Sequence, residues 1–423
     1  MKLRKFTFLF FLFLFTSGAF ASDFDYLYNF YYSRDYFRLK NNFEKIILQE
    51  KWKNDFLKGV VLSVFSKHSE SNAVFSDLLN YYGNVIHDSI KTEIYKHKAI
   101  NHENLCEYKE ALSNLNIIKE KYLAYLKGDE KEEIMDDIPV YDALKDEPPQ
   151  TVSEKTGEKI QMKKDIAGLW NIPVFINGEN IDFVFDTGAN ITVIVESYAK
   201  KLGIKIIDSK IKVGTSTDIK VVSKVGICKE LKIGNIIYKN VAILVMPDES
   251  LTFGGGFYKI YGIIGNPVIK AFEEFTIDKN NLLTVSDSPE INNYSNMCFE
   301  GYNPIIQLVY SADSLSFLFD SGANRTSLFS PFYNLYKEDI ENKYTLIDII
   351  VGGAGGERKF KGYRLKNITL QTGNLSAELK EADLIIEKIK DEDMYYYGKL
   401  GQDYIKKFEQ IKFNFKSMFI EFN

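Results

Sequence analysis

The chain has 423 residues, of which 45% are hydrophobic and 26% charged, and its formal net charge is −5 at pH 7. This composition is typical of a folded protein with room for about three domains of ~100–200 residues each. A mildly acidic chain without a basic block is poorly suited to bind the phosphate backbone, so we expect no nucleic-acid partner.

The N-terminus has the three parts of a secretory signal peptide. Three basic residues within the first five positions precede an apolar run over residues 6–15, and "AFA" offers a small-x-small cleavage site that ends at Ala21. The run is shorter than the ~20 residues of a membrane span, although a short membrane anchor is the alternative. We predict that residues 1–21 are removed. The mature chain, with net charge −8 (−5 − 3), would be exported to the periplasm or secreted, without a stable membrane span.

Residues 22–138 have a helical pattern, because Gly and Pro are nearly absent and apolar residues recur at three- and four-residue steps. Tyr108 and Ala111 stand where a tetratricopeptide (TPR) repeat has an aromatic and a small residue for close helix crossing. The similarity covers about one repeat, so an unrelated helical bundle is an equal alternative. We predict a helical, TPR-like domain that offers a surface to a protein partner.

The next segment, residues 139–163, is charged, contains Pro148-Pro149 and is predicted to be a linker. Beyond it, short runs of Ile, Val and Phe are separated by Asn-Gly and Gly-Asn turns, which predicts a mainly β structure. The chain is therefore expected to combine an α domain with a β portion. Its three cysteines, Cys106, Cys228 and Cys298, lack a paired or metal-like spacing and are predicted to be buried small residues.

The β portion contains its landmarks twice. "FDTGAN" at 185–190 recurs as "FDSGAN" at 319–324, and the two aspartates are 134 positions apart (320 − 186). "YGIIGN" at 261–266 recurs as "YGKLGQ" at 397–402, at an offset of 136 (397 − 261). Landmarks in one order and near one offset indicate duplication. We predict two lobes, 164–289 and 297–423, joined by a connection over 290–296.

Each repeated motif combines an aspartate with a hydroxyl residue and a glycine. These are Asp186, Thr187 and Gly188 in the first copy and Asp320, Ser321 and Gly322 in the second. The hydroxyl can fix the turn, and the glycine permits close backbone approach. Two carboxyl groups that meet across a pseudo-two-fold axis share a proton, because both cannot ionise cheaply. The ionised member can then deprotonate a water while the protonated one polarises a peptide carbonyl, without metal or cofactor.

Histidine chemistry is excluded from the lobes, since residues 139–423 contain no histidine. Neither lobe can supply a Ser-His-Asp triad or a histidine-zinc site. His102 and Cys106 share one helical face, but two ligands do not make a metal site. If the lobes are catalytic, carboxylates must act.

The lobes resemble the retropepsin-type aspartic proteases, the clan that includes retroviral proteases and, more distantly, bilobal pepsins. The resemblance rests on "FDTGAN" with "YGIIGN" and "FDSGAN" with "YGKLGQ", and it spans nearly all of the chain beyond the linker. It implies a bilobal acid-protease fold in which Asp186 and Asp320 form the catalytic dyad and Thr187 and Ser321 lock the two turns together. Each later glycine would be followed by a short helix. Substrates would be extended protein segments that add strand-like hydrogen bonds.

The resemblance also implies two flap hairpins that close over a bound peptide. "VGTSTD" at 213–218 and "VGGAGGER" at 351–358 occupy their place. The glycines expected there are Gly214, Gly352, Gly353, Gly355 and Gly356. Small residues suit a mobile tip, although a plain glycine-rich loop is the alternative.

The sequence departs from the family pattern at two places. Retroviral members often form an Asp–Arg pair where this chain is expected to bring Asn190 and Asn324 to face Asn266 and Gln402. In addition, Lys399 stands where the other lobe has Ile263, and both are predicted to line the substrate cleft. A lysine there would lower the pKa of a neighbouring carboxyl and favour acidic substrates, or it marks a lobe that has drifted from catalysis.

We therefore expect an exported aspartic endopeptidase that is a monomer carrying both half-sites. One alternative is a binding module whose cleft and helical domain capture peptides or a partner without hydrolysis. A second alternative is an obligate homodimer that pairs lobes between chains.

Overall fold

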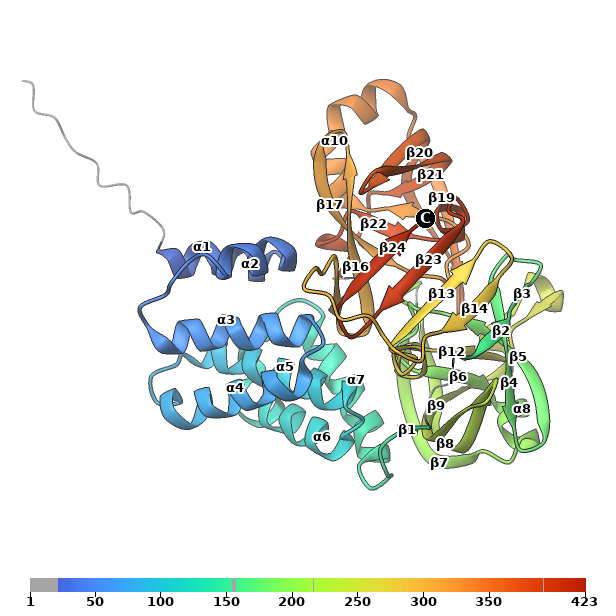
Figure 1. Cartoon of the computed structure of the whole chain (residues 1–423), viewed down its shortest axis with the longest axis horizontal. Helices are drawn as coiled ribbons and strands as arrows, with labels where there is room; N and C mark the ends of the chain where they lie inside the picture. The colour runs from blue at the N-terminus through green and yellow to red at the C-terminus, as the bar shows by residue number, and fades with distance from the viewer. Residues whose placement is uncertain (1–21, 154–156, 216, 391) are drawn as a thin grey trace, which may run out of the picture.

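The computed structural model describes residues 22–153, 157–215, 217–390 and 392–423, so the predicted signal peptide lies outside the described residues. An N-terminal helical region is followed by two mainly β regions, which we call the first lobe (151–285) and the second lobe (297–422). Figure 1 shows the helical region beside both lobes. Within the described ranges, every helix is too short or too polar to traverse a bilayer.

The helical region is a succession of amphipathic helices, several of them in antiparallel pairs. Its elements are α1 (Asp23–Tyr32), α2 (Tyr36–Phe43), α3 (Lys51–Val64), α4 (His68–Tyr82), α5 (Asp88–Asn104), α6 (Tyr108–Ile117), η1 (Ile118–Tyr122), η2 (Leu123–Tyr125) and α7 (Glu130–Leu144). A capping box of Ser22 and Asp25 starts α1. A side chain at Gly59 of α3 would lie 2.4 Å from the ring of Phe75 in α4, so this glycine sets how closely the two helices pack.

The end of the helical region differs from the prediction. Helix α7 continues to Leu144 and contains Pro139, although proline inside a helix costs ~3 kcal/mol or more. Burial of Tyr141 and Leu144, with Tyr141 stacked on Tyr108 at 6.3 Å between ring centroids, offsets this cost. The predicted linker 139–163 is therefore wrong in its extent, because it begins as helix and its later part contains strands.

The first lobe is built on a nine-stranded sheet with the order β1-β9-β6-β12-β5-β4-β8-β7 and β3 beside β4. Strands β5 and β12 are parallel and β12 and β6 antiparallel, so β12 is threaded between them. The elements are β1 (Thr151–Val152), β2 (Lys159–Gln161), β3 (Lys163–Lys164), β4 (Trp170–Ile176), β5 (Glu179–Phe185), β6 (Thr192–Val195), α8 (Glu196–Lys201), β7 (Lys205–Gly214), β8 (Lys220–Ile233), β9 (Ile236–Met246), η3 (Asp248–Leu251), β10 (Thr252–Phe253), η4 (Gly254–Gly256), β11 (Tyr258–Lys259), β12 (Gly262–Ile264), α9 (Asn266–Lys270), β13 (Glu274–Asp278) and β14 (Leu282–Val285).

The second lobe has an eight-stranded sheet with the order β15-β16-β17-β22-β18-β21-β20-β19. Here β22 is threaded between β17, to which it is parallel, and β18, to which it is antiparallel. The elements are β15 (Met297–Glu300), β16 (Asn303–Tyr310), β17 (Asp313–Phe319), β18 (Ser327–Leu328), α10 (Ser330–Lys343), β19 (Ile347–Gly353), β20 (Gly356–Thr372), β21 (Leu375–Ile385), η5 (Glu392–Met394), β22 (Gly398–Leu400), α11 (Gln402–Ile405), β23 (Gln410–Asn414) and β24 (Phe419–Phe422). Short helices α9 and α11 follow the threaded strands, as the resemblance predicted.

A third sheet joins the lobes, with the order β2-β14-β13-β23-β24. Strand β13 of the first lobe pairs with β23 of the second over five residue pairs. The rings of Phe275 and Phe413 stack across this junction at 5.0 Å. Phe185 packs on Phe275 and Phe319 on Phe413, so the residue before each motif aspartate is anchored on the shared sheet.

The helical region contacts both lobes through partly buried polar groups. Arg34 pairs with Glu300 of the second lobe at 2.9 Å, and the hydroxyl of Tyr36 donates to the same carboxylate at 2.7 Å. The ammonium of Lys270 in the first lobe donates to Asn104 of α5 at 2.7 Å. The start of α2 and the end of α5 therefore contact different lobes.

Candidate active site

The two motif aspartates lie on equivalent turns at the ends of β5 and β17. The backbone N–H of Asp186 donates to Ile264 O at 3.1 Å, and that of Asp320 donates to Leu400 O at 3.0 Å. Each threaded strand therefore fixes the start of one turn. Within each turn, the aspartate Oδ1 accepts the N–H of the glycine two positions later, at 2.8 Å for Asp186 and 2.9 Å for Asp320.

The hydroxyl groups of Thr187 and Ser321 bind the two turns to each other. Thr187 Oγ1 donates to Phe319 O at 3.0 Å and accepts the N–H of Ser321 at 3.0 Å. Reciprocally, Ser321 Oγ donates to Phe185 O at 2.7 Å and accepts the N–H of Thr187 at 3.0 Å. Both side chains are fully buried. Four hydrogen bonds without solvent competition therefore hold one turn to the other.

The glycines of the motifs leave room for the carboxyl group of the opposite lobe. A Cβ atom on Gly322 would lie 2.3 Å from Cγ of Asp186, and one on Gly188 would lie 2.7 Å from Cγ of Asp320. Neither position tolerates a side chain. Each carboxyl group thus rests against the turn of the other lobe, and the structure brings Asp186 and Asp320 together.

The electrostatics of the pair are unequal. Burial, followed by the negative charge of Asp320, raises the pKa of the Asp186 carboxyl well above its usual range, while the N–H of Gly188 and the charge of Lys399 act in the opposite direction. A hydrogen bond between the two carboxyl groups contributes to the same rise.

Lys399 lies inside the site, with Nζ 3.1 Å from Oδ2 of Asp320. Burial is the largest single influence and lowers the pKa of the Lys399 ammonium, but the charge and hydrogen bond of Asp320, together with the charges of Asp393 and Asp186, outweigh burial, so the pKa is raised. The lysine is therefore a cation in contact with one member of the pair. Ile263, at the corresponding place of the first lobe, packs with apolar residues.

The expected pairing of asparagines is wrong. Asn190 and Asn324 are exposed, whereas Asn266 and Gln402 are buried. The buried amides instead donate to the motif backbone, Asn266 Nδ2 to Thr187 O at 2.6 Å and Gln402 Nε2 to Ser321 O at 2.9 Å. A buried carbonyl needs a donor, and these amides supply one at short range.

The glycines that the sequence assigned to flaps lie at the ends of two hairpins. Gly214 ends β7 in the hairpin β7–β8, where Ser216 lies outside the described residues. In the hairpin β19–β20, Gly353 pairs with Gly356, and Gly352 lies one step before Gly353.

The two hairpins touch each other across the lobes. The N–H of Gly355 donates to Ser250 O at 2.9 Å, and a Cβ atom on Gly355, where φ is +85°, would lie 3.0 Å from Val221 of β8. Arg358 of β20 donates to Thr217 O at 3.0 Å and pairs with Asp218 at 3.1 Å. The tips of the two hairpins are thus in direct contact.

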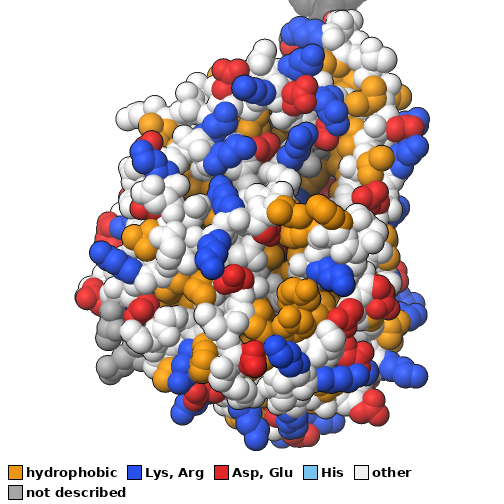
Figure 2. Space-filling model, turned by 90° about the vertical axis from the view of Figure 1, so that its right-hand side faces the viewer, with side chains coloured by type: hydrophobic (Ala, Val, Ile, Leu, Met, Phe, Trp, Pro, Cys, Tyr) orange, Lys and Arg blue, Asp and Glu red, His pale blue; other side chains and the backbone are white. Residues whose placement is uncertain are grey.

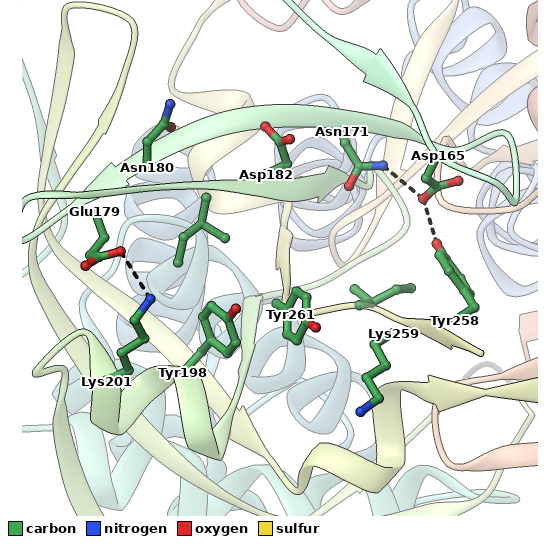
Figure 3. A pocket seen from close by; sticks show the side chains of 12 residues that line it. Asp165, Asn171, Glu179, Asn180, Asp182, Tyr198, Lys201, Tyr258, Lys259 and Tyr261 are labelled. Atoms are coloured by element: carbon green, nitrogen blue, oxygen red, sulfur yellow. Dashed lines mark hydrogen bonds and ion pairs between the residues drawn. The ribbon is translucent and has the colours of Figure 1, made fainter. Parts of the chain in front are cut away.

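A separate pocket of about 370 Å³ opens on the first lobe, and the motif aspartates do not line it. Figure 3 shows Tyr258 and Asn171 directed at Asp165, with hydrogen bonds of 2.6 and 2.9 Å. Tyr198 and Tyr261 also line the pocket, and their rings lie tilted against each other with 4.3 Å between the centroids. The carboxylate of Asp165 already accepts hydrogen bonds from Tyr258 and Asn171. The aspartate pair is therefore the stronger candidate for acid–base chemistry.

The face of the lobes that points away from the helical region carries hydrophobic side chains near its middle and charged side chains around them (Figure 2). Within the described part of the chain, no group of three or more His, Cys, Asp or Glu side chains is arranged to hold a metal ion. The carboxyl pair and Lys399 are the groups of the lobes that we consider for acid–base chemistry.

Several contributors to the site were not identified from the sequence. Arg358 was quoted only as part of a glycine-rich loop, and Ser250 and the carbonyl-binding role of Asn266 were not foreseen. Their partners are backbone carbonyls or residues of the other lobe, which short-range patterns do not encode. The identical positions of Asn266 and Gln402 after the threaded glycines were the one available signal.

Comparison with known families agrees with this geometry over part of the chain. A family model described as Aspartyl protease matches residues 172–268, which include Asp186, its turn and the threaded strand β12. No curated protein matches the sequence. The match supports an aspartyl protease domain within the first lobe, and with it a peptidase.

Proposed function

We propose that the chain is an exported aspartic endopeptidase in which two retropepsin-like lobes, related by a pseudo-two-fold axis, form one active site. Asp186 and Asp320 are its dyad. The observation that carries the proposal is the reciprocal seating of each carboxyl group against the glycine of the opposite turn. The aspartyl protease match over residues 172–268 supports the same activity.

In this mechanism the dyad holds one proton between two carboxyl groups. The ionised carboxylate takes a proton from a bound water, whose oxygen attacks the peptide carbonyl carbon. The protonated carboxyl gives its proton to the carbonyl oxygen. The resulting diol then collapses: the C–N bond breaks, the amine leaves with a proton from the dyad, and a diol hydroxyl returns its proton to the dyad as the carboxyl product forms. Reciprocal hydroxyl contacts fix the geometry of the two acids throughout.

The substrate is an extended segment of a peptide or protein that lies under the hairpins β7–β8 and β19–β20, which act as flaps. Ile263 and Lys399 flank the scissile bond from the two threaded strands. The enzyme acts as a monomer after removal of residues 1–21, in the periplasm or outside the cell. The TPR-like helical region captures substrate or docks a protein partner.

A second function is favoured by one observation, the ion pair of Lys399 with Asp320. A cation on the dyad weakens the carboxylate as a base, so a chain with low or absent hydrolysis would still bind extended peptides in the same cleft. This is the binding-module alternative.

The test is proteolysis of an unfolded protein and a peptide library by the purified mature chain. We expect cleavage, and we expect both Asp186→Asn and Asp320→Asn to abolish it. Asp182→Asn is the matched control, because Asp182 is an exposed acid on β5 that forms a loose ion pair of 3.8 Å with Lys163. Full activity in both dyad variants would remove the protease function, and peptide binding without cleavage by the parent would favour the binding module.

A further inference from the structure

The two threaded strands put different side chains at one equivalent position. Ile263 of β12 pairs with Val184, two residues before Asp186. Lys399 of β22 pairs with Leu318, two residues before Asp320. The backbone register is therefore the same in both lobes, and the difference is one of side-chain chemistry.

The surroundings of these two side chains differ as strongly as their chemistry. Ile263 packs on an apolar cluster that includes Val193, Val221 and Leu251. Lys399 reaches Oδ2 of Asp320 at 3.1 Å, and the Asp320 side chain is only 14% exposed. Asp320 of the pair thus has a cation in contact, whereas the first lobe has an apolar side chain at the position that corresponds to the lysine.

We propose that the Lys399 ammonium gives the two carboxyl groups fixed and unequal charge states, with Asp320 held as the carboxylate and Asp186 left with the proton. This assignment rests on the proposed function for its catalytic meaning, but it describes the charges of the resting site whether or not the chain cleaves peptides. Lys399 is then a positioning residue for the proton of the dyad.

The charges that face the pair support this assignment. Lys399 is surrounded by Asp320, by Asp393 of η5 and by Asp186. Ionisation of both members of the pair would place a second negative charge beside the first in a partly buried site that holds one ammonium, and one proton on the pair removes that repulsion. Asp320 is the member in contact with the ammonium, so the negative charge is most stable there. The raised pKa of Asp186 agrees with its holding the proton.

The assignment fixes the direction of each proton transfer. Asp320 takes a proton from water as the C–O bond forms, and Asp186 gives its proton to the carbonyl oxygen. When the diol collapses, the proton on Asp320 goes to the leaving nitrogen and a diol hydroxyl returns a proton to Asp186. The pair ends in its starting state, and the peptide has consumed one water.

The direct test is ¹³C NMR of the mature chain labelled at aspartate carboxyl carbons, near neutral pH. Asp186→Asn and Asp320→Asn assign the two signals by their disappearance. We expect Asp186 at the position of a protonated carboxyl and Asp320 at that of a carboxylate. Equal positions, or the reverse order, in the parent would overturn the assignment, and this measurement requires neither substitution of the lysine nor any activity.

Substitution of the lysine provides the second arm. In Lys399→Met the shared proton no longer prefers Asp186 over Asp320, so the two carboxyl signals should move toward each other. Lys399→Arg keeps the cation and should keep the signals apart. Ile263→Met is the matched control in the first lobe and should leave both signals in place. Unchanged signals in a folded Lys399→Met chain would also overturn the assignment.

The pH profile of kcat/KM distinguishes this inference from the proposed function. Because the cation stabilises ionised carboxyl groups, its loss in Lys399→Met should move the alkaline limb of the profile to higher pH by about one to three units. A merely structural role would lower the rate without moving the limb, and that result would count against the assignment. A parent that cleaves nothing defeats the proposed function, while the carboxyl signals still decide the charge states.

Discussion

The two lobes are alike where they contact each other, and they differ in the side chain that lies beside each carboxyl group. The turns, the reciprocal hydroxyl contacts and the threaded strands occur in both lobes with nearly equal distances. The residue beside the carboxyl group is isoleucine in one lobe and lysine in the other. A change in one of the reciprocal turn residues also disturbs its counterpart in the other lobe. A side chain such as Lys399, which contacts one carboxyl group, has no such counterpart and can differ between the lobes.

The largest expected effect comes from the motif glycines. Gly188→Ala and Gly322→Ala would each push a methyl group into the opposite carboxyl group, and a displacement of about 1 Å at a reacting group costs on the order of a hundred-fold in rate. We expect kcat/KM to fall by at least about that factor in both variants, and more for Gly322→Ala, where the contact is shorter.

Gly373→Ala is the control for the glycine variants. It adds a methyl group at a hairpin turn, where φ is +55° and no atom lies within 4 Å, so it should cost some stability and leave kcat/KM unchanged. A large loss of kcat/KM in only one of the two motif variants would contradict the equivalence of the two lobes.

The next effect concerns the reciprocal hydroxyl groups. Thr187→Ala and Ser321→Ala each leave a buried N–H and a buried carbonyl without a partner, which costs about 2–4 kcal/mol of unfolding free energy. We expect similar losses for both variants in urea unfolding. Thr187→Ser keeps the hydroxyl and should lose less, and a pair of very different losses would show that the contact is not reciprocal.

A pH effect should separate two lysines at corresponding places. Burial lowers the pKa of Lys270 to about 7, whereas Lys406, which follows α11 as Lys270 ends α9, is exposed. Above pH 7 the unfolded chain holds a proton on Lys270 that the folded chain has lost, so stability rises with pH until the unfolded lysine also titrates.

We therefore expect the stability of the parent relative to that of Lys270→Met to rise from pH 7 to pH 9 in thermal unfolding. The same difference for Lys406→Met should stay flat. Burial also raises the pKa of Glu103 to about 7, and its contribution falls between pH 4.5 and 7, so the range above pH 7 is the one to compare. If the stability relative to the parent varied with pH in the same way for both lysine variants, the lowered pKa of Lys270 would be contradicted.

The smallest effect concerns the contact between the hairpins. Arg358 is partly exposed, so its pairing with Asp218 is worth at most about 1 kcal/mol. Arg358→Ala should speed amide exchange of Gly355 by about two- to five-fold, because this N–H is bonded across the lobes. Arg364→Ala removes an ion pair within the second lobe and should leave that exchange rate unchanged.

Sequence reasoning gave the local parts of the site and missed most of the long-range ones. The repeated motif identified both aspartates and their hydroxyl neighbours, because a motif that occurs twice can be recognised within one sequence. The amide donors Asn266 and Gln402 were assigned the wrong partners, since the carbonyls they bind lie about 80 positions away.

The fold beyond the motifs was predicted in outline only. Alternating apolar residues indicated strands, but the sheet shared by β13 and β23 depends on the approach of two lobes, which no local pattern describes. Helix α7 was ended too early, because the proline signal is local while the burial of Tyr141 and Leu144 that overrides it is tertiary.

The pairing of β13 with β23 means that the peptide over residues 290–296 is not the main tether between the halves. Five ladder positions and a stacked phenylalanine pair hold them at the seam. A single nick in that peptide should leave a molecule that behaves as one body, and the two pieces made separately would have a template on which to reassemble.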